Sequence, residues 1–363
     1  MYKWMILAAS IFLRVSAWAE SSEAEVLFSD GFEMPVIAAP DNAIAGDVLW
    51  ESEPSRPALA DFAALLLQGQ TESLGFSIDV ATQTLGGLGV WRPVRLEVYP
   101  NGRFWGRIEI AGKAGTLVRV RVRHDGCKPS QRIEIFSLEF NGPRKTEPAL
   151  KSVVPLEVSP AAYDSSLSRP LTKPAVIPRS EWGAAKPTVA YEPLTTPQII
   201  TVHHTEAYQA MSYEHAKEEI RIIQHYHQRG RHWDDIGYHF VIDGSGRIYE
   251  GRPITALGAH VAYFNPGNIG IAVMGNFQKM GRRPTQKQIA KLKELVRYLG
   301  LLYSIPAKRV FGHKDLDKSR KCPGKALYRY LPEVRAALSR PAPAKTRPVA
   351  ETLDSVYARF RFD

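Results

Sequence analysis

The first half of the chain alternates apolar and polar residues with the period of a β-strand. In residues 116–123, three valines alternate with three arginines, which predicts a strand with one buried face. Strands are also expected at 94–99 and 103–110, because the Asn-Gly at 101–102 between them is a strong hairpin signal. A further strand is expected at 132–140. The series predicts a small all-β domain, either an antiparallel sandwich or a barrel.

The second half mixes strand patterns with helical ones. Apolar residues recur at helical spacing in 213–229 and again in the segment after Thr285, a residue suited to capping a helix. Short apolar runs predict strands at 198–203, 236–243, 247–250, 269–274 and 309–312. This order of elements predicts an α/β domain in which a mixed sheet is flanked by helices.

Proline-rich segments separate these parts. Seven prolines occur between Pro143 and Pro178 with few sustained apolar patterns among them, which predicts a semi-extended linker. A chain of 363 residues is long enough for two domains. We expect a β domain over 20–142, a linker over 143–173, an α/β domain over 174–338 and a Pro/Ala-rich tail over 339–363.

The first 19 residues have the pattern of an export signal. Lys3 supplies positive charge, an apolar run covers 4–13, and Ala17 and Ala19 are small residues at the positions that a signal peptidase reads. The run is about half the roughly 20 apolar residues that a membrane-spanning helix needs. We therefore expect cleavage after Ala19, no transmembrane segment, and a secreted or periplasmic protein.

Charge narrows the class of partner. The net charge of +10 favours anionic partners, such as nucleic acid, anionic membranes and acidic cell-wall polymers. The arginines of 116–123 could hold an anionic glycan, although a solvated face is the commoner explanation for such a row. Nucleic acid is supported by the charge alone and is disfavoured by the export signal, so no nucleic-acid partner is expected. The two cysteines allow one disulfide at most, which excludes a disulfide scaffold.

Histidine is concentrated in the second half of the chain, where nine of the ten lie between His203 and His313. Histidine is the commonest protein ligand of zinc, and a catalytic zinc keeps three protein ligands and one open position. His203 and His204 point to opposite faces of their strand, so one of them can reach a metal. His313 and Cys322 are nine residues apart across a basic loop, and imidazole with thiolate suits zinc rather than magnesium or calcium. Three others are expected to be packing or surface residues: His215, His225 and His232.

At these residues the chain resembles the peptidoglycan recognition proteins and the related zinc-dependent N-acetylmuramoyl-L-alanine amidases, including the phage lysozyme-amidases. The matching stretches occur in family order over roughly 155 residues, a length that makes the match specific. They are IPRSEWGA at 177–184, ITVHHT at 200–205, WDDIGYHFVIDGSGRIYEGRP at 233–253, GNIGIAVMGNF at 267–277 and GHKD…CPG ending at Gly324. The N-terminal 150 residues are not covered by the resemblance.

The resemblance implies a zinc centre and a reaction. His203, His313 and Cys322 match the zinc ligands of the family, which would leave Cys127 unpaired. Tyr238 matches the tyrosine that assists the attacking water and the tetrahedral intermediate. The implied substrate bond is the amide between the lactyl group of N-acetylmuramic acid and L-alanine. Zinc can lower the pKa of bound water to about 7, and a tyrosine hydroxyl can stabilise the oxyanion that forms.

For three further positions, the resemblance leaves more than one role open. Arg320 stands where the phage enzymes have a lysine and recognition proteins often have threonine, so it is expected as a catalytic cation, with Lys321 as the alternative. Its guanidinium could stabilise the oxyanion or hold a stem-peptide carboxylate, and the second role is favoured. His260 and Asn268 lie where family members line the peptide groove, and both could instead be structural. The cytosolic muropeptide-recycling relatives carry a glutamate base where this chain has Ala272, so the chain resembles the branch without that glutamate.

The sequence therefore predicts an exported zinc-dependent N-acetylmuramoyl-L-alanine amidase that acts on peptidoglycan. The role of its N-terminal β domain is left open, with targeting as one possibility. The alternative is a non-catalytic peptidoglycan-binding module, because many recognition proteins keep the fold and lose hydrolysis. Binding-only members typically lack the cysteine ligand, and the presence of Cys322 favours the enzyme.

Overall fold

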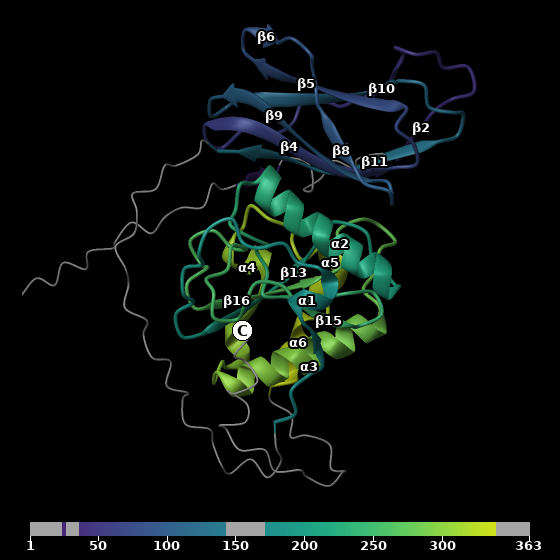
Figure 1. The fold of residues 1–363 in the computed structure, drawn as a ribbon. Coiled ribbons are helices and arrows are strands. Elements are labelled where there is room, and N and C mark those ends of the chain that lie inside the picture. The colour runs from purple at the N-terminus through teal and green to yellow at the C-terminus, as the bar shows by residue number, and fades with distance from the viewer. Residues whose placement is uncertain (1–23, 27–35, 143–170, 339–363) are drawn as a thin grey trace, which may run out of the picture.

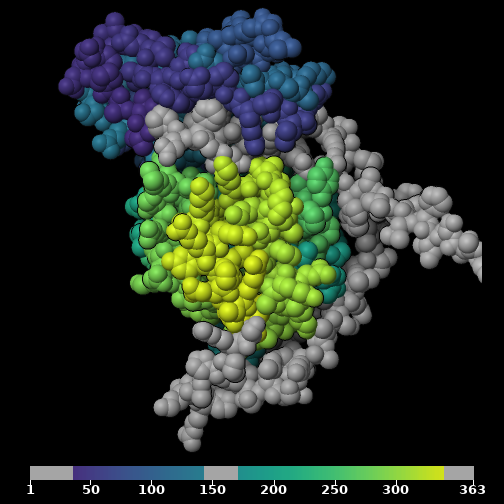
Figure 2. Space-filling model, turned by 180° about the vertical axis from the view of Figure 1, so that it is seen from behind, coloured from purple at the N-terminus to yellow at the C-terminus, as the bar shows by residue number. Residues whose placement is uncertain are grey.

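The computed structural model describes residues 24–26, 36–142 and 171–338, which form two domains (Figure 1). The expected signal sequence and the C-terminal tail lie outside these residues, as does the expected linker apart from residues 171–173. Among the described residues, no helix is long and apolar enough to cross a membrane. In the space-filling view the N-terminal residues form a lobe seated on the C-terminal one (Figure 2).

The N-terminal domain is a sandwich of two antiparallel sheets. Its strands are β1 (Ala24–Val26), β2 (Val36–Ala38), β3 (Val48–Glu51), β4 (Phe62–Thr71), β5 (Phe76–Thr84), β6 (Gly87–Leu88), β7 (Arg92–Pro93), β8 (Leu96–Val98), β9 (Arg103–Gly112), β10 (Leu117–His124) and β11 (Arg132–Asn141). The first sheet has the order β1-β11-β4-β9-β8, with β2 also paired to β11. The second has the order β3-β10-β5-β6, with β7 also paired to β5.

The alternation along β10 builds the core between the two sheets. Val118, Val120 and Val122 are at most 1% exposed and join a cluster that includes Leu65 of β4 and Phe104 of β9, in the opposite sheet. The domain is therefore a sandwich rather than a barrel, because two separate sheets share one core.

The arginine row on the outer face of β10 is balanced by carboxylates. Arg121 and Arg123 both donate from Nε to Asp79 of β5, at 2.7 and 2.8 Å. Arg119 pairs with Glu51 of β3 at 2.8 Å. These pairs favour the solvated face over an anionic-glycan site, because the row carries little uncompensated charge.

The C-terminal domain contains a six-stranded mixed sheet. Its elements are β12 (Val176–Ile177), α1 (Arg179–Trp182), β13 (Ile199–His204), α2 (Tyr213–His225), η1 (Tyr226–Gly230), β14 (Phe240–Ile242), β15 (Ile248–Glu250), β16 (Asn268–Val273), α3 (Gln286–Leu302), η2 (Ala307–Arg309), β17 (Val310–Gly312), α4 (His313–Leu316), α5 (Lys325–Tyr328) and α6 (Leu331–Ala336). The strand order is β12-β15-β14-β16-β13-β17, and every neighbouring pair is parallel except β14 with β15.

Helices cover both faces of this sheet, as the sequence predicts. Successive residues of β14 alternate, so that Val241 packs toward α2 and Ile242 toward α3, α5 and α6. Thr285 caps α3 by accepting a hydrogen bond from the N–H of Gln288. The helix expected at 213–229 is α2 followed by the π-helical turn η1.

The first sheet of the sandwich docks on α2 and η1 (Figure 1). Leu66 of β4 and Trp105 of β9 pack with Tyr226 of η1 in a cluster of buried residues. Arg103 and Glu219, at most 2% exposed, form an ion pair across the boundary at 3.1 Å. A shift of the two domains within this interface would leave both charges buried without a partner, so the pair disfavours other registers.

Candidate active site

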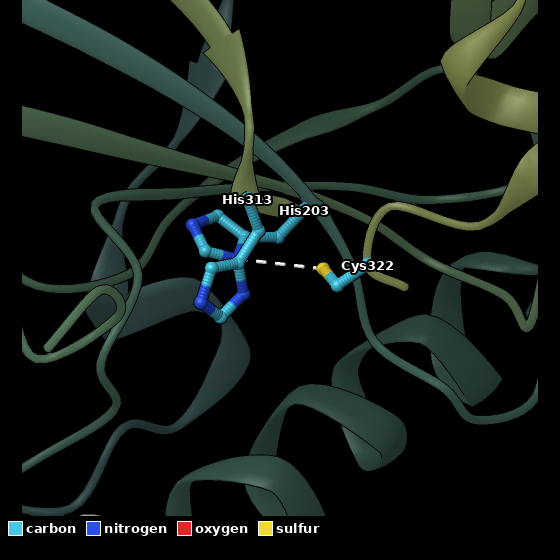
Figure 3. A group of neighbouring side chains, drawn as sticks. All are labelled: His203, His313 and Cys322. Atoms are coloured by element: carbon cyan, nitrogen blue, oxygen red, sulfur yellow. Dashed lines mark hydrogen bonds between the residues drawn. The ribbon is translucent and has the colours of Figure 1, made fainter. Parts of the chain in front are cut away.

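Three side chains that can bind a metal meet at the carboxyl ends of parallel strands (Figure 3). His203 lies on β13, His313 follows β17, and β13 and β17 are parallel neighbours. Cys322 reaches them because its loop folds back, with the N–H of Lys314 donating to the Cys322 carbonyl at 2.8 Å. The ligand atoms of the three residues lie within 4.8 Å of one another. The sequence prediction that these residues come together is therefore met by their geometry.

The donor set and its spacing fit zinc. A tetrahedral zinc with bonds of about 2.3 Å to sulfur and about 2.05 Å to nitrogen separates those two atoms by about 3.6 Å. The distance from His203 Nδ1 to Cys322 Sγ is 3.6 Å. Magnesium and calcium prefer oxygen ligands, so imidazole and thiolate donors disfavour them.

A chain of buried hydrogen bonds orients His203. The carbonyl oxygen of Asn268 can only accept, so His260 carries a proton on Nε2, which lies 3.1 Å from that oxygen. Nδ1 of His260 must then accept from Nε2 of His203 at 3.1 Å. This leaves the Nδ1 lone pair of His203 facing Cys322. A second hydrogen-bond partner that fixes the tautomer is typical of metal-binding histidines.

Burial keeps the candidate ligands in the form that binds metal. Burial lowers the pKa of His203 well below its ordinary value, and the nearby His313 adds to this shift. Burial and the positive charge of Arg320 lower the pKa of His313 in the same way. Both imidazoles are therefore neutral at pH 7, and a neutral imidazole has the lone pair that a metal requires.

His204 points to the opposite face of β13, as the strand alternation predicts. Its Nδ1 accepts from the N–H of Phe277 at 3.1 Å, so its Nε2 donates to Glu206 at 3.2 Å. The backbone N–H of His204 lies 3.4 Å from Cys322 Sγ and donates to it. His204 therefore supports the site through its backbone and through Glu206.

A cavity opens beside the three candidate ligands. It is lined by the following residues, which come from both domains: Gln68, Glu139, His203, His204, Thr205, Glu206, Ile223, Tyr226, His227, Arg231, Trp233, Tyr238, Ala259, His260, Val261, Ala262, Asn265, His313, Asp317, Arg320, Lys321 and Cys322. The expected cation Arg320 and its alternative Lys321 both line it. Nε of Arg320 donates to Asp317 at 3.1 Å, which restrains the side chain at the cavity wall.

Tyr238 lies next to the first candidate ligand. The centroids of its ring and the His203 ring are 5.2 Å apart. Burial, with the negative charge of Cys322 adding to it, raises the pKa of Tyr238 above its ordinary value. The phenol therefore stays protonated at neutral pH and can donate a hydrogen bond to a developing oxyanion.

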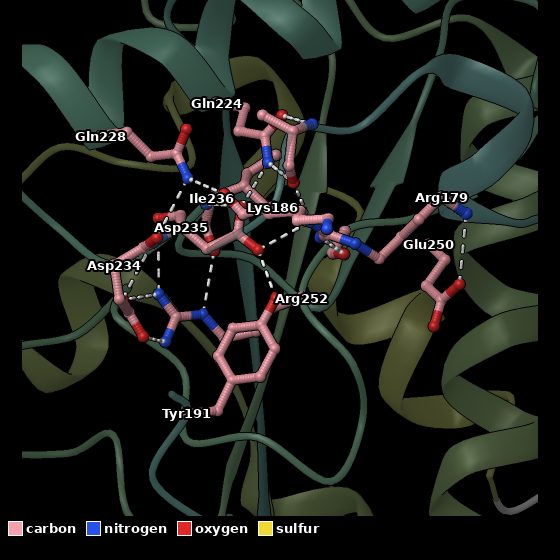
Figure 4. Close-up of polar contacts among 12 residues, drawn as sticks. Arg179, Lys186, Tyr191, Gln224, Gln228, Asp234, Asp235, Ile236, Glu250 and Arg252 are labelled. Carbon is pink, nitrogen blue, oxygen red and sulfur yellow. Dashed lines mark hydrogen bonds and ion pairs between the residues drawn. The ribbon is translucent and has the colours of Figure 1, made fainter. Parts of the chain in front are cut away.

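A buried polar network holds the segment that carries Tyr238 (Figure 4). Arg252 donates to both carboxylate oxygens of Asp234, at 2.8 and 2.5 Å. Nε2 of Gln224 donates to Asp235 at 2.6 Å. Because these carboxylates lie three and four residues before Tyr238, the network fixes the backbone that presents the phenol to the cavity.

Of the two residues expected in the peptide groove, His260 lines the cavity and Asn268 does not. His260 lines the cavity, but its ring nitrogens contact His203 and the backbone of Asn268. The Asn268 side chain is fully buried, accepts from Thr201 and donates to the carbonyl of Phe264. Asn268 is therefore too enclosed to contact a substrate, and this expectation is corrected. Asn265, three residues earlier, lines the cavity instead.

Sequence reasoning missed several cavity residues. His227 was not expected in the site, yet it lines the cavity and accepts from the N–H of Gly237 at 3.1 Å. The π-helical turn η1 that carries it has no signature in apolar periodicity. Gln68 and Glu139 were missed because they belong to the N-terminal domain, where no catalytic motif pointed to them.

Comparison with known proteins matches the C-terminal domain. Residues 193–325 match the family model described as N-acetylmuramoyl-L-alanine amidase. The chain is 32% identical to N-acetylmuramoyl-L-alanine amidase of Mus musculus over 163 residues. This alignment covers 44% of this chain and 30% of the mouse protein. The chain thus spans about a third of the length of the mammalian amidases that it matches.

The match extends over most of the length of smaller relatives. The chain is 30% identical over 155 residues to peptidoglycan-recognition protein SD of Drosophila melanogaster, covering 42% of this chain and 82% of that one. The crystal structure of the same Drosophila protein aligns with 30% identity and a TM-score of 0.41, covering 44% of this chain and 94% of that one. Through its C-terminal domain, the chain belongs to the family of peptidoglycan recognition proteins and N-acetylmuramoyl-L-alanine amidases.

Proposed function

We propose that the protein is an exported, zinc-dependent N-acetylmuramoyl-L-alanine amidase. Its substrate would be peptidoglycan, cleaved at the amide between the lactyl group of N-acetylmuramic acid and the L-alanine of the stem peptide. The observation that carries the proposal is the cluster of His203, His313 and Cys322, whose sulfur-to-nitrogen distance of 3.6 Å suits tetrahedral zinc. The names of the relatives support the substrate class, since they include both amidases and peptidoglycan recognition proteins.

The metal and the protein would divide the chemistry. Zinc supplies Lewis acidity, which makes water a competent nucleophile at neutral pH and polarises the scissile carbonyl. Tyr238 donates its hydroxyl hydrogen bond to the carbonyl oxygen as that oxygen gains charge. Arg320 adds positive charge to the same cavity, where a guanidinium can stabilise the oxyanion or hold a stem-peptide carboxylate through paired donors.

The attacking water must lose a proton, and the departing amine must gain one. Glu206 lines the cavity and is the carboxylate nearest in sequence to His203. Burial opposes its ionisation, but the hydrogen bond from His204 and the charge of Arg320 outweigh burial and lower the pKa of Glu206 below its ordinary value. An ionised carboxylate here is the candidate to accept the proton from water and return it to the amine.

The test uses the full chain, loaded with zinc, on purified sacculi. Mass spectrometry of the digest should detect glycan strands with a free lactyl carboxylate and released peptides with a free L-alanine amine. Cys322→Ser should lose both the zinc and the products. Binding of sacculi by the zinc-loaded wild type without either product would favour the non-catalytic recognition module instead.

A further inference from the structure

The N-terminal sandwich forms part of the wall of the active-site cavity. Gln68 of β4 and Glu139 of β11 line the same cavity as the candidate zinc ligands. Both come from a domain that the family match does not include. The side chain of Glu139 is only 1% exposed, so it is buried where the two domains meet.

Glu139 forms an ion pair with Arg231, which lines the same cavity. Nη2 of Arg231 donates to Oε1 of Glu139 at 2.7 Å, and the arginine side chain is 16% exposed. Its guanidinium lies 4.8 Å from the ring centroid of Trp233 and 5.4 Å from that of Tyr226. Two aromatic rings of the C-terminal domain and one carboxylate of the N-terminal domain therefore define the position of Arg231.

The ion pair of Glu139 and Arg231 lies where both charges are poorly solvated. Burial raises the pKa of Tyr226, and the negative charge of the neighbouring Glu139 adds to this shift. The charge that pairs with Glu139 is the guanidinium of Arg231, at 2.7 Å. In a buried interface each charge compensates the other, and an arginine deprived of its carboxylate would seek another anion.

We propose that Glu139 is a positioning residue supplied by the N-terminal domain, which fixes Arg231 and cancels its charge. The guanidinium then offers N–H donors to an uncharged, oxygen-bearing part of the substrate and attracts anions less strongly than it would without Glu139. If the proposed function holds, that uncharged part is the amino sugar of the muropeptide. The anionic stem-peptide carboxylate is left to Arg320 and Lys321, which also line the cavity.

A second glutamate on the same strand provides a matched control. Glu134 of β11 also pairs across the domain boundary, with Lys279 at 2.5 Å and Arg282 at 3.8 Å. It does not line the cavity described above. Glu134→Gln therefore removes one interface charge without touching Arg231, whereas Glu139→Gln removes the charge but keeps an oxygen that can accept from Arg231.

The first measurement is calorimetric binding of inorganic phosphate to the metal-free full chain, so that phosphate cannot ligate zinc. Glu139→Gln should bind phosphate at least about tenfold more tightly than the wild type, the ratio that corresponds to about 1.4 kcal/mol. The double variant Glu139→Gln/Arg231→Gln should return to the wild-type value, and Glu134→Gln should match the wild type. Equal phosphate affinity in Glu139→Gln and wild type, or an equal gain in Glu134→Gln, would overturn the proposal.

The second measurement is steady-state kinetics of the zinc-loaded full chain on a muramyl-peptide substrate. Glu139→Gln should raise KM about tenfold with a smaller change in kcat, because it disturbs substrate binding rather than the reacting atoms. Its zinc content should equal that of the wild type. Inactivity of the wild type would defeat the proposed function, while the phosphate measurement would still decide the role of Glu139.

Discussion

Replacing His260 tests the hydrogen-bond chain that orients the first candidate zinc ligand. His260→Ala removes the acceptor for Nε2–H of His203, a residue that is 1% exposed. Stranding a buried N–H costs about 1–3 kcal/mol. Loss of the hydrogen-bond partner of a metal ligand typically weakens metal binding by about 10- to 100-fold. This range agrees with the free-energy cost of the stranded N–H, because about 1.4 kcal/mol corresponds to a tenfold change in affinity. We expect zinc affinity to fall within that range.

The assay is competition for zinc between the full chain and a chelator of known affinity, with circular dichroism as the control for folding. His260→Asn should lose less affinity than His260→Ala, because the amide oxygen can replace Nδ1 as acceptor. The reasoning fails if His260→Ala keeps wild-type zinc affinity. A raised KM for muropeptide in that variant, with zinc binding unchanged, would restore the groove-lining role that the family resemblance implies.

Three further predictions concern turnover, substrate charge and pH. Tyr238→Phe should keep its zinc, measured by elemental analysis, while kcat falls by roughly ten- to a thousand-fold, the contribution of one oxyanion hydrogen bond; unchanged kcat would make the tyrosine a packing residue. Arg320→Ala should raise KM mainly for a free-acid stem peptide and little for its amidated twin, whereas equal losses of kcat on both would indicate an oxyanion role. Burial lowers the pKa of His239 from 6.5 to about 4. The imidazole of His239 is therefore protonated at a higher pH in the unfolded chain than in the folded one. The free energy of unfolding should fall as the pH drops from 6.5 toward 4, by up to about 3 kcal/mol. Urea unfolding at both ends of this window should show a smaller loss in His239→Gln, and an equal loss would refute the assignment.

The parts of the site that follow local periodicity could be predicted from the sequence. Alternation on a strand separates His203 from His204, and the structure places them on opposite faces of β13. The same rule predicts the buried valines and half-buried arginines of β10. Both predictions rest on a period of two residues, which a strand obeys whatever packs against it.

The parts that depend on packing between distant segments could not be predicted in this way. Asn265 and Asn268 are three residues apart, and the pairing of β16 with its neighbours decides that Asn268 is enclosed. Nothing in the periodicity of Leu66 or Trp105 shows that the outer face of the first sheet covers Tyr226. A residue on the outer face of a sheet becomes an interface residue when another domain packs on that face. Whether this happens depends on the complementary shape and charge of the two surfaces rather than on the local sequence pattern.

The cavity wall therefore depends on two parts of the molecule. The candidate metal ligands are positioned by the parallel strands β13 and β17 and by the loop of Cys322, all within one domain. Arg231, which also lines the cavity, is tied by an ion pair to the N-terminal sandwich. The buried pair of Arg103 with Glu219 keeps that sandwich in register, because breaking it would leave a charge unpaired in the interface. On the role proposed for Glu139, the N-terminal domain forms part of the wall of the site, and changes in its sequence should alter substrate binding while leaving the metal ligands unchanged.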